Sequence, residues 1–328
     1  MKPIKMFDVF SGIGGAVEAA RGLPLRSVGG CEWGKSAAAV YWSNNGHYPY
    51  GNIWEVDPAK IEPFDLLFAS PDCSPYSKMG KQTGLQHPAS RAVFGLEPII
   101  AYHKPKAIVF ENVCEWPEWQ DGRALALISS AFERHGYHSL TDKRAWRKLN
   151  SAKFGIPTQR KRFFGVMLRK DFDPDDLKWP DPSLPMVPLS TVLQPEDEVR
   201  HLVCKRKDMI PCTQKRPGPY SPRLVGYYGI KFRDKMVYNC NGPSSTFVRA
   251  NSGLSSTSNL YMTGSGIVRK LSIREMLRAM SYGDHFVIPM PFGIAARLIG
   301  SSLVPAVLHE VFKMAIKVIS KGKATKCA

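Results

Sequence analysis

Cys73 stands directly after a short apolar run and between two prolines. The run Phe64–Ala69 predicts a buried strand of a parallel sheet. Pro71 and Pro75 take the chain out of regular structure on either side of the thiol. A thiol at the carboxyl end of such a strand lies where open α/β sheets bind ligands, so Cys73 is a candidate nucleophile. The alternative is a small buried hydrophobe, the commonest state of a lone cysteine.

A carboxylate and two guanidinium groups could act beside this thiol. The apolar run Ala107–Phe110 predicts a second strand, and Glu111 at its end would face the same crevice, where it could share a proton with a substrate nitrogen. Arg160 and Arg162 are two positions apart, so an extended chain points both to one side. They could hold an anion, a carbonyl oxygen or Glu111, and a solvated basic turn is the alternative.

A glycine-rich turn near the start of the chain predicts a site for a nucleotide-type cofactor. The apolar strand Ile4–Phe10 precedes Gly12, Gly14 and Gly15, and the helix-forming run 16–20 follows. Glycine lets the backbone approach a ligand closely, and a helix that begins there offers free N–H groups. The spacing is not G-x-G-x-x-G, so a tight turn without a ligand is the alternative.

An acidic residue and a tryptophan follow the next predicted strand, Ser27–Cys31. Glu32 stands 20 positions after Gly12, and a carboxylate there suits both hydroxyl groups of a ribose. Trp33 beside it offers a flat face for an adenine ring. A tryptophan of the hydrophobic core is the alternative.

These residues need a sheet that brings several strand ends together. Residues 1–176 alternate short apolar runs with helical runs such as 122–135, which predicts an α/β fold with a doubly wound, mostly parallel sheet. Five prolines between positions 174 and 188 indicate a linker. Residues 177–267 are rich in Pro, Gly, Ser and Tyr and predict a small, irregular, β-rich domain. Residues 268–328 return helices to the first domain.

The charge of the chain favours a polyanionic partner. Lys and Arg number 45 against 28 acidic residues, so the net charge is +17 and the pI about 9.6. Eleven of the basic residues and two acids fall in 200–250, which we call the basic segment. Its aromatic side chains between the charges include Tyr220, Tyr227, Tyr228 and Phe232. Basic side chains would contact phosphates and aromatic ones would shape the approach to bases, against the alternative of a solvated charged face.

Taken in order, seven motifs resemble the DNA (cytosine-5) methyltransferase family over nearly the whole chain. They are Phe7–Gly15, Glu32-Trp33, Pro71–Ser77, Glu111-Asn112-Val113, the pair Arg160 and Arg162, Arg269–Glu275, and Ile299–Val304. The resemblance implies a class I, Rossmann-like, S-adenosyl-L-methionine-dependent methyltransferase whose domain 177–267 recognises the DNA target. It implies that the cofactor is bound by Phe10, Gly12, Gly14, Glu32, Trp33, Asn52, Ile53, Pro71, Ser301 and Ser302.

The chemistry implied is methyl transfer to carbon 5 of a cytosine in double-stranded DNA. Cys73 would add to ring carbon 6, Glu111 would act at ring nitrogen 3, and Arg162 would hold oxygen 2. Arg160 is the fourth catalytic residue that the resemblance implies. The base must leave the duplex, and the segment Ser74–Arg91 would close on it.

The chain departs from the family pattern at several positions. Asp72 and Ser74 replace the usual proline and glutamine beside the cysteine, and Ser301 replaces an asparagine of the last motif. Thr158 stands in place of a glutamine. Asn52 stands for an aspartate that faces the adenine amino group, and its amide oxygen can still accept that hydrogen bond.

Two other functions stay open: methylation of RNA, as in the tRNA-methylating branch of this fold, and DNA binding without catalysis. Seven cysteines without zinc spacing indicate free thiols in a reducing cytoplasm, of a prokaryotic or phage type. No apolar stretch is expected to be long enough for a membrane span. We expect a monomer, which a cognate restriction endonuclease could accompany.

Overall fold

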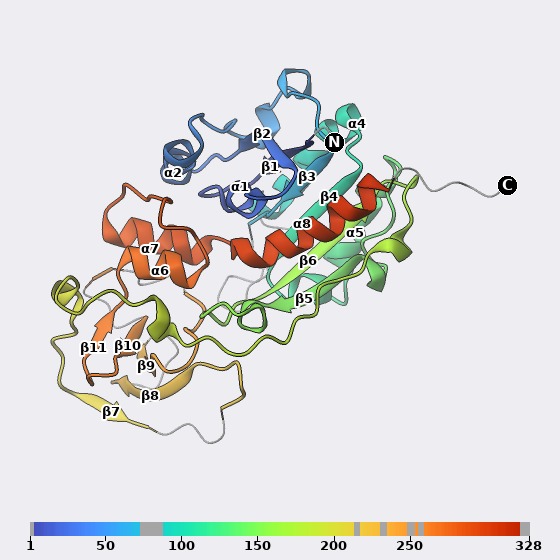
Figure 1. Cartoon of the computed structure of the whole chain (residues 1–328). Helices are drawn as coiled ribbons and strands as arrows, with labels where there is room; N and C mark the ends of the chain where they lie inside the picture. The colour runs from blue at the N-terminus through green and yellow to red at the C-terminus, as the bar shows by residue number, and fades with distance from the viewer. Residues whose placement is uncertain are drawn as a thin grey trace. The chain divides into compact units, whose positions relative to one another are not determined.

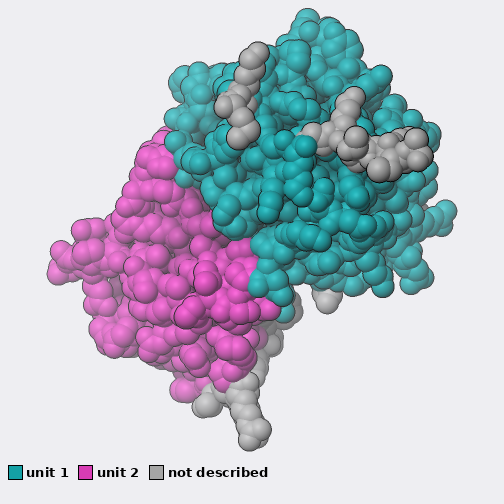
Figure 2. All heavy atoms as spheres, turned by 45° about the vertical axis from the view of Figure 1, so that its right-hand side comes forward, with its two compact units in different colours: residues 1–149, 161–181, 307–328 teal, residues 150–160, 182–306 magenta. Residues whose placement is uncertain are grey.

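The computed structural model divides the chain into two compact units, shown in Figure 2. It describes residues 3–72, 88–212, 217–229, 235–247, 253–254 and 259–321. Unit 1 comprises residues 1–149, 161–181 and 307–328. Unit 2 comprises residues 150–160 and 182–306.

Unit 1 is built on a six-stranded sheet with the strand order β2-β1-β3-β4-β6-β5 (Figure 1). Its strands are β1 Ile4–Val9, β2 Leu25–Cys31, β3 Leu66–Ala69, β4 Ala107–Asn112, β5 Trp146–Asn150 and β6 Lys161–Leu168. The first four are parallel to their neighbours, and β6 pairs with β4 in the antiparallel direction. The predicted doubly wound, mostly parallel sheet is confirmed.

Apolar side chains cover both faces of this sheet, which explains why its strands are continuous apolar runs. Phe7 and Phe110 lie in one core cluster with Ile99 of α4 and Phe132 of α5. On the other face Phe68 packs edge-on against Phe312 of α8, at 5.8 Å between ring centroids. The helices of this unit are α1 Gly15–Ala20, α2 Lys35–Asn45, α3 Pro88–Arg91, α4 Leu96–His103, α5 Arg123–Glu133 and α8 Pro305–Ser320.

Unit 2 contains a second sheet, with the order β11-β10-β9-β8-β7. Its strands are β7 Met209–Pro211, β8 Arg223–Tyr228, β9 Met236–Asn239, β10 Leu260–Met262 and β11 Val268–Lys270. Two helices follow, α6 Ile273–Ala279 and α7 Phe292–Ser301. Short strands around a small core of Tyr228, Val237 and Leu260 confirm the predicted β-rich region.

The expectation that every apolar stretch is too short for a membrane span is wrong on length. Phe292–Ser320, which joins α7 and α8, is long and apolar enough by length and composition alone. It is not one continuous helix, because residues 302–304 separate α7 from α8, and half of its most apolar window is buried in the protein. Core helices pass the same test of composition, because they too are apolar.

Candidate active site

The site is assembled at the carboxyl ends of four neighbouring strands in unit 1. One row of the sheet runs across these strands in register through Cys31, Val9, Ala69 and Phe110. The next residues along each strand therefore emerge at one edge: Glu32, Phe10, Ser70 and Glu111. The register thus brings two predicted site carboxylates and the residues just before Cys73 to the same edge of the sheet.

The turn Phe10–Gly14, which we call the cofactor turn, has a backbone that few side chains tolerate. Phe10, Gly12 and Gly14 have positive φ angles of 59°, 55° and 94°. A Cβ atom at Gly14 would lie 2.9 Å from Nδ2 of Asn45, whereas one at Gly12 would meet no atom within 4 Å. The positive φ favours glycine at position 14, where the end of the Asn45 side chain is also close, while at position 12 the backbone faces open space.

Glu32 is already tied to the cofactor turn. Its carboxylate accepts hydrogen bonds from the backbone N–H of Gly12, at 2.9 Å, and of Gly34, at 2.7 Å. Burial raises the pKa of Glu32, and the negative charge of Asp72 adds to this, although the two N–H donors act against it. Trp33 is 79% exposed, so it is not a core tryptophan, and its ring is free to stack on a flat ligand.

Asn52 and Ile53 are brought beside the end of β2 by the backbone of Tyr50. The N–H of Glu32 donates to the Tyr50 carbonyl, and the N–H of Tyr50 donates to that of Gly30. Oδ1 of Asn52 accepts from the N–H of Trp54, and its Nδ2 donates to the Glu55 carboxylate at 3.0 Å.

One partner of the Asn52 amide is a donor and the other an acceptor, so they orient it unambiguously. Its oxygen keeps a second lone pair for a ligand. Ile53 is buried.

Glu111 links the ends of β3 and β4. It is 5% exposed, accepts a hydrogen bond from Oγ of Ser70 at 2.7 Å, and lies 3.3 Å from Nε of Arg162 through its other oxygen. The amide of Asn112 donates to the carbonyl of Pro71 at 3.1 Å. Sequence reasoning missed Ser70, although its position directly after a strand is a signal.

Cys73 itself lies outside the described residues, as do Ser74 and the greater part of the predicted loop Ser74–Arg91. The described chain reaches Asp72, and the carbonyl of Pro71, two residues before Cys73 in the sequence, accepts the hydrogen bond from Asn112.

The two arginines contact different groups. Arg162 in unit 1 lies against Glu111, as predicted, whereas both terminal nitrogens of Arg160 donate to the carbonyl of Gly300, at 3.2 Å each. Arg160 is buried, and the carbonyl it holds belongs to the last turn of α7 in unit 2. Of the partners predicted for the pair, Arg162 therefore contacts Glu111 and Arg160 contacts a carbonyl oxygen, at the end of a helix.

Ser301 and Ser302 stand at this braced end of α7. Their hydroxyl groups donate to the backbone carbonyls of Arg297 and Ile299, at 3.0 and 2.9 Å. Thr158 is also committed within unit 2, where its hydroxyl pairs with that of Ser244 at 2.6 Å. These hydroxyl groups therefore shape the local backbone.

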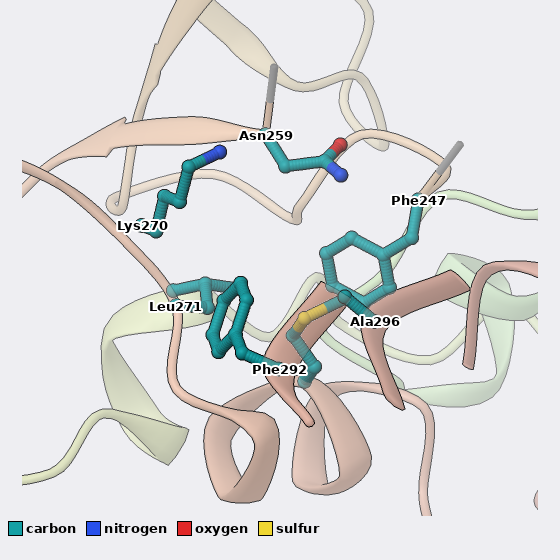
Figure 3. A pocket seen from close by; sticks show the side chains of 7 residues that line it. Phe247, Asn259, Lys270, Leu271, Phe292 and Ala296 are labelled. Carbon is teal, nitrogen blue, oxygen red and sulfur yellow. The ribbon is translucent and has the colours of Figure 1, made fainter. Parts of the chain in front are cut away.

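Unit 2 also has a small pocket, which Figure 3 shows with its side chains. It is lined by Phe247, Asn259, Lys270, Leu271, Met276, Phe292 and Ala296. Its volume of about 10 Å³ accommodates one water-sized sphere, far less than a nucleoside needs. Burial lowers the pKa of Lys270 in its wall to about 8.

Comparison with known proteins decides the family. The model of the family described as C-5 cytosine-specific DNA methylase matches residues 4–317. This chain belongs to that family. The methylase is thus an S-adenosylmethionine-dependent DNA (cytosine-5) methyltransferase, in agreement with the resemblance of its motifs.

Curated relatives span almost the same length. The chain is 28% identical over 312 residues to Type II methyltransferase M.HhaI of Haemophilus parahaemolyticus, covering 94% of this chain and 93% of that protein. It is 28% identical over 318 residues to Type II methyltransferase M.HaeII of Haemophilus aegyptius, covering 95% and 92%.

Solved structures share the fold. The S. pombe Dnmt2 methyltransferase matches with a TM-score of 0.72 at 16% identity, covering 96% of this chain and 99% of that one. The Entamoeba histolytica methyltransferase EhMeth matches with a TM-score of 0.70 at 16% identity, covering 97% and 99%.

The described residues of the methylase fit its cofactor. The open space beside Gly12, the exposed ring of Trp33 and the carboxylate of Glu32 form a cradle for an adenosine at one edge of the sheet. Pro71, whose carbonyl is held by Asn112, belongs to the same edge. A flat ring, a diol and a narrow chain of atoms are the parts of S-adenosylmethionine that such groups suit.

Proposed function

We propose that Cys73 is the covalent nucleophile of the methyltransferase and that Glu111 and Arg162 act on the same cytosine ring. The supporting observation is the contact of Glu111 with Ser70, three residues before Cys73, on one oxygen and with Arg162 on the other. Asn112, at the end of β4, also donates to the carbonyl of Pro71, which follows β3. Glu111 and Cys73 therefore belong to two chain segments that are hydrogen-bonded to each other.

In this proposal the thiolate of Cys73 forms a bond to ring carbon 6, and the 5,6 double bond opens toward carbon 5. Glu111 stabilises the charge at ring nitrogen 3, and Arg162 holds oxygen 2. S-adenosylmethionine, when bound, supplies the methyl group that carbon 5 takes up. Loss of the carbon-5 proton to a base then restores the double bond, breaks the bond to sulfur and frees Cys73. The target must be flipped out, since these atoms are inaccessible in a stacked duplex.

Trapping of the covalent adduct tests this mechanism. Duplex DNA with 5-fluorocytosine at the target and S-adenosylmethionine should give a stable protein–DNA adduct, because fluorine cannot leave as a cation. Cys73→Ser should bind DNA and form no adduct, since a hydroxyl is far less ionised than a thiol. Glu111→Gln should form it at least about a hundredfold more slowly, the loss typical of one proton-donating or charge-stabilising group.

Cys114→Ser is the matched control, because Cys114 is a free cysteine in the same unit. Its adduct should form at the wild-type rate. An adduct in Cys73→Ser, or one that maps to another cysteine, would refute the assignment.

Most of the proposed cofactor residues follow from the same edge of the sheet. We assign the ribose hydroxyl groups to Glu32, the adenine face to Trp33 with Phe10, and the adenine amino group to the free lone pair of Asn52. The other proposed contacts are Gly12, Gly14, Ile53, Pro71, Ser301 and Ser302.

We assign recognition of double-stranded DNA to the domain 177–267 and within it to the basic segment. Residues 1–176 would carry catalysis and cofactor binding, and 268–328 would complete that domain. Lys205 and Lys207 are exposed, whereas Arg206 pairs with Asp208 and lies over the Tyr228 ring at 5.1 Å. The parts 213–216 and 230–234 of the segment, with Phe232, lie outside the described residues.

We further propose a monomer in a prokaryotic cytoplasm, with or without a cognate restriction endonuclease. Bisulfite sequencing of DNA and tRNA from a host that expresses the chain gives base, substrate and sequence context together. Methylation of tRNA alone would overturn the DNA assignment of the recognition domain.

A further inference from the structure

Asp8 is a buried acid on β1, two residues before the cofactor turn. It is 0% exposed, and neither of its carboxyl oxygens has a hydrogen-bond partner among the residues that the structure describes. The nearby hydroxyl of Ser11 donates instead to the backbone carbonyl of Asp8, at 2.8 Å, and accepts from the N–H of Cys31 at 3.1 Å. A carboxylate buried without partners is strongly disfavoured, so the neutral acid is the form that fits this place.

The surroundings of Asp8 are polar and depend on a glycine. Gly30 stands opposite Asp8 in the register of β1 and β2. A Cβ atom there would lie 2.4 Å from Oγ of Ser11, 3.0 Å from the hydroxyl of Tyr41 and 3.1 Å from the carbonyl of Asp8. The Tyr41 hydroxyl is buried and also lacks a partner. The absence of a side chain at Gly30 therefore leaves room for a small polar cluster beneath the cofactor turn.

This cluster is continuous with the cofactor site. Ser11 is followed by Gly12, whose N–H donates to Glu32. We propose that Asp8 is a positioning residue for the cofactor turn, held as a neutral acid so that the N–H of Gly12 keeps its hydrogen bond to Glu32 and the Glu32 carboxylate stays in place for the cofactor. This inference rests on the proposed contact of Glu32 with the ribose.

The electrostatics of the cluster agree with this role. Burial raises the pKa of Asp8 to about 8, the charge of Glu32 adds to the rise, and the Ser11 hydroxyl opposes it. The other acids that face Asp8 are Cys31 on β2 and Tyr41 on α2, and burial with the charge of Asp8 raises the pKa of both. Ionised Asp8 would compete with Glu32 for the donors of the turn above about pH 8.

The first test is calorimetry of S-adenosylhomocysteine binding as a function of pH. From about pH 7 to about pH 9, the affinity of the wild type should fall about tenfold more than the affinity of Asp8→Asn. The reason is that only roughly a tenth of the Asp8 side chains stay neutral one pH unit above their pKa. The amino group of the ligand titrates equally in both proteins, so only the difference in slope counts. Asp181→Asn, at an exposed position, should keep the wild-type slope. Equal slopes in wild type and Asp8→Asn would overturn the proposal.

Thermal unfolding without ligand is the second test. The pKa of Asp8 is higher in the folded state than in the unfolded state. The contribution of Asp8 to the free energy of unfolding is therefore fully present below its unfolded pKa and is lost as the pH rises through about 8. The melting temperature of Asp8→Asn relative to the wild type should therefore rise from about pH 4 to about pH 8. Above that pH the difference should stay constant. Parallel curves would overturn the proposal.

The two tests separate this inference from the function on which it rests. Failure of the wild type to bind S-adenosylhomocysteine at any pH would contradict the cofactor assignment of Glu32, and the melting curves would still judge Asp8. If Asp8→Asn does not fold, carbon-13 NMR of the wild-type aspartate carboxyls replaces it. One carboxyl should titrate near pH 8. Titration of every one below about pH 5 would overturn the proposal.

Discussion

At the scale of single residues, the site is defined by carboxylates whose surroundings differ. Glu32 is held by two backbone N–H groups, Glu111 by a hydroxyl and a guanidinium group, and the carboxyl oxygens of Asp8 have no hydrogen-bond partner within the described chain. A carboxylate with backbone donors is suited to accept hydrogen bonds from a diol, because its geometry is fixed in advance. The environment of each acid, rather than its type, assigns its role.

We expect Glu32→Ala to weaken cofactor binding. The change removes two charge-assisted hydrogen bonds to the ribose and also the bond that holds Gly12 of the turn, so binding should lose on the order of 2–4 kcal/mol. Calorimetry with S-adenosylhomocysteine measures this. Glu62→Ala is the control, because Glu62 pairs with Lys5 and Arg26 at the surface, and it should cost less than about 1 kcal/mol of cofactor binding. An unaltered affinity in Glu32→Ala would place the ribose elsewhere.

At the scale of secondary structure, strand register and helix ends position the functional groups. The row through Cys31, Val9, Ala69 and Phe110 delivers one site residue from each strand. The end of α7 is held differently, by a buried guanidinium group on the carbonyl of Gly300. Two arginines that are neighbours in sequence thereby support different elements.

Replacement of each arginine should separate these roles. Arg160→Met should lower the free energy of unfolding by about 1.5–3 kcal/mol, since it removes the charge-assisted hydrogen bonds to a carbonyl in the interior. Arg162→Met should lower stability less, because Arg162 is more exposed than Arg160, and should slow adduct formation with 5-fluorocytosine DNA. Urea denaturation and trapping kinetics measure the two effects. Equal stability losses in both variants would contradict the split.

At the scale of the whole molecule, the charge is distributed unevenly along the chain. The basic segment carries a net charge of +9 of the total +17, from eleven basic residues and two acids. Such a concentration steers a polyanion and makes its binding depend on salt. Part of this charge is already paired within the protein, as at Arg206.

Neutralising Lys205, Arg206 and Lys207 together should weaken DNA binding and flatten its salt dependence. The slope of the logarithm of the DNA-binding constant against the logarithm of the salt concentration should become less steep by the equivalent of about two phosphate contacts. It is two rather than three because Arg206 is already paired with Asp208. Affinity for S-adenosylhomocysteine should stay unchanged. Lys313→Gln with Lys317→Gln on α8 is the control and should keep the wild-type slope. The same slope in the triple variant would move DNA binding to another surface.

The sequence by itself determined the parallel sheet, the family and the candidate groups of the site. Apolar runs, glycine turns and motif order are local patterns, and local sterics and side-chain alternation dictate what they form. Only the tertiary structure decided that Trp33 is exposed, that Arg160 holds Gly300, that Ser70 joins Glu111 and that the carboxyl oxygens of Asp8 have no hydrogen-bond partner among the described residues. These pairings join residues up to 140 positions apart. They depend on strand register and on burial, which no local pattern specifies, because a side chain's partner is chosen only when distant segments pack.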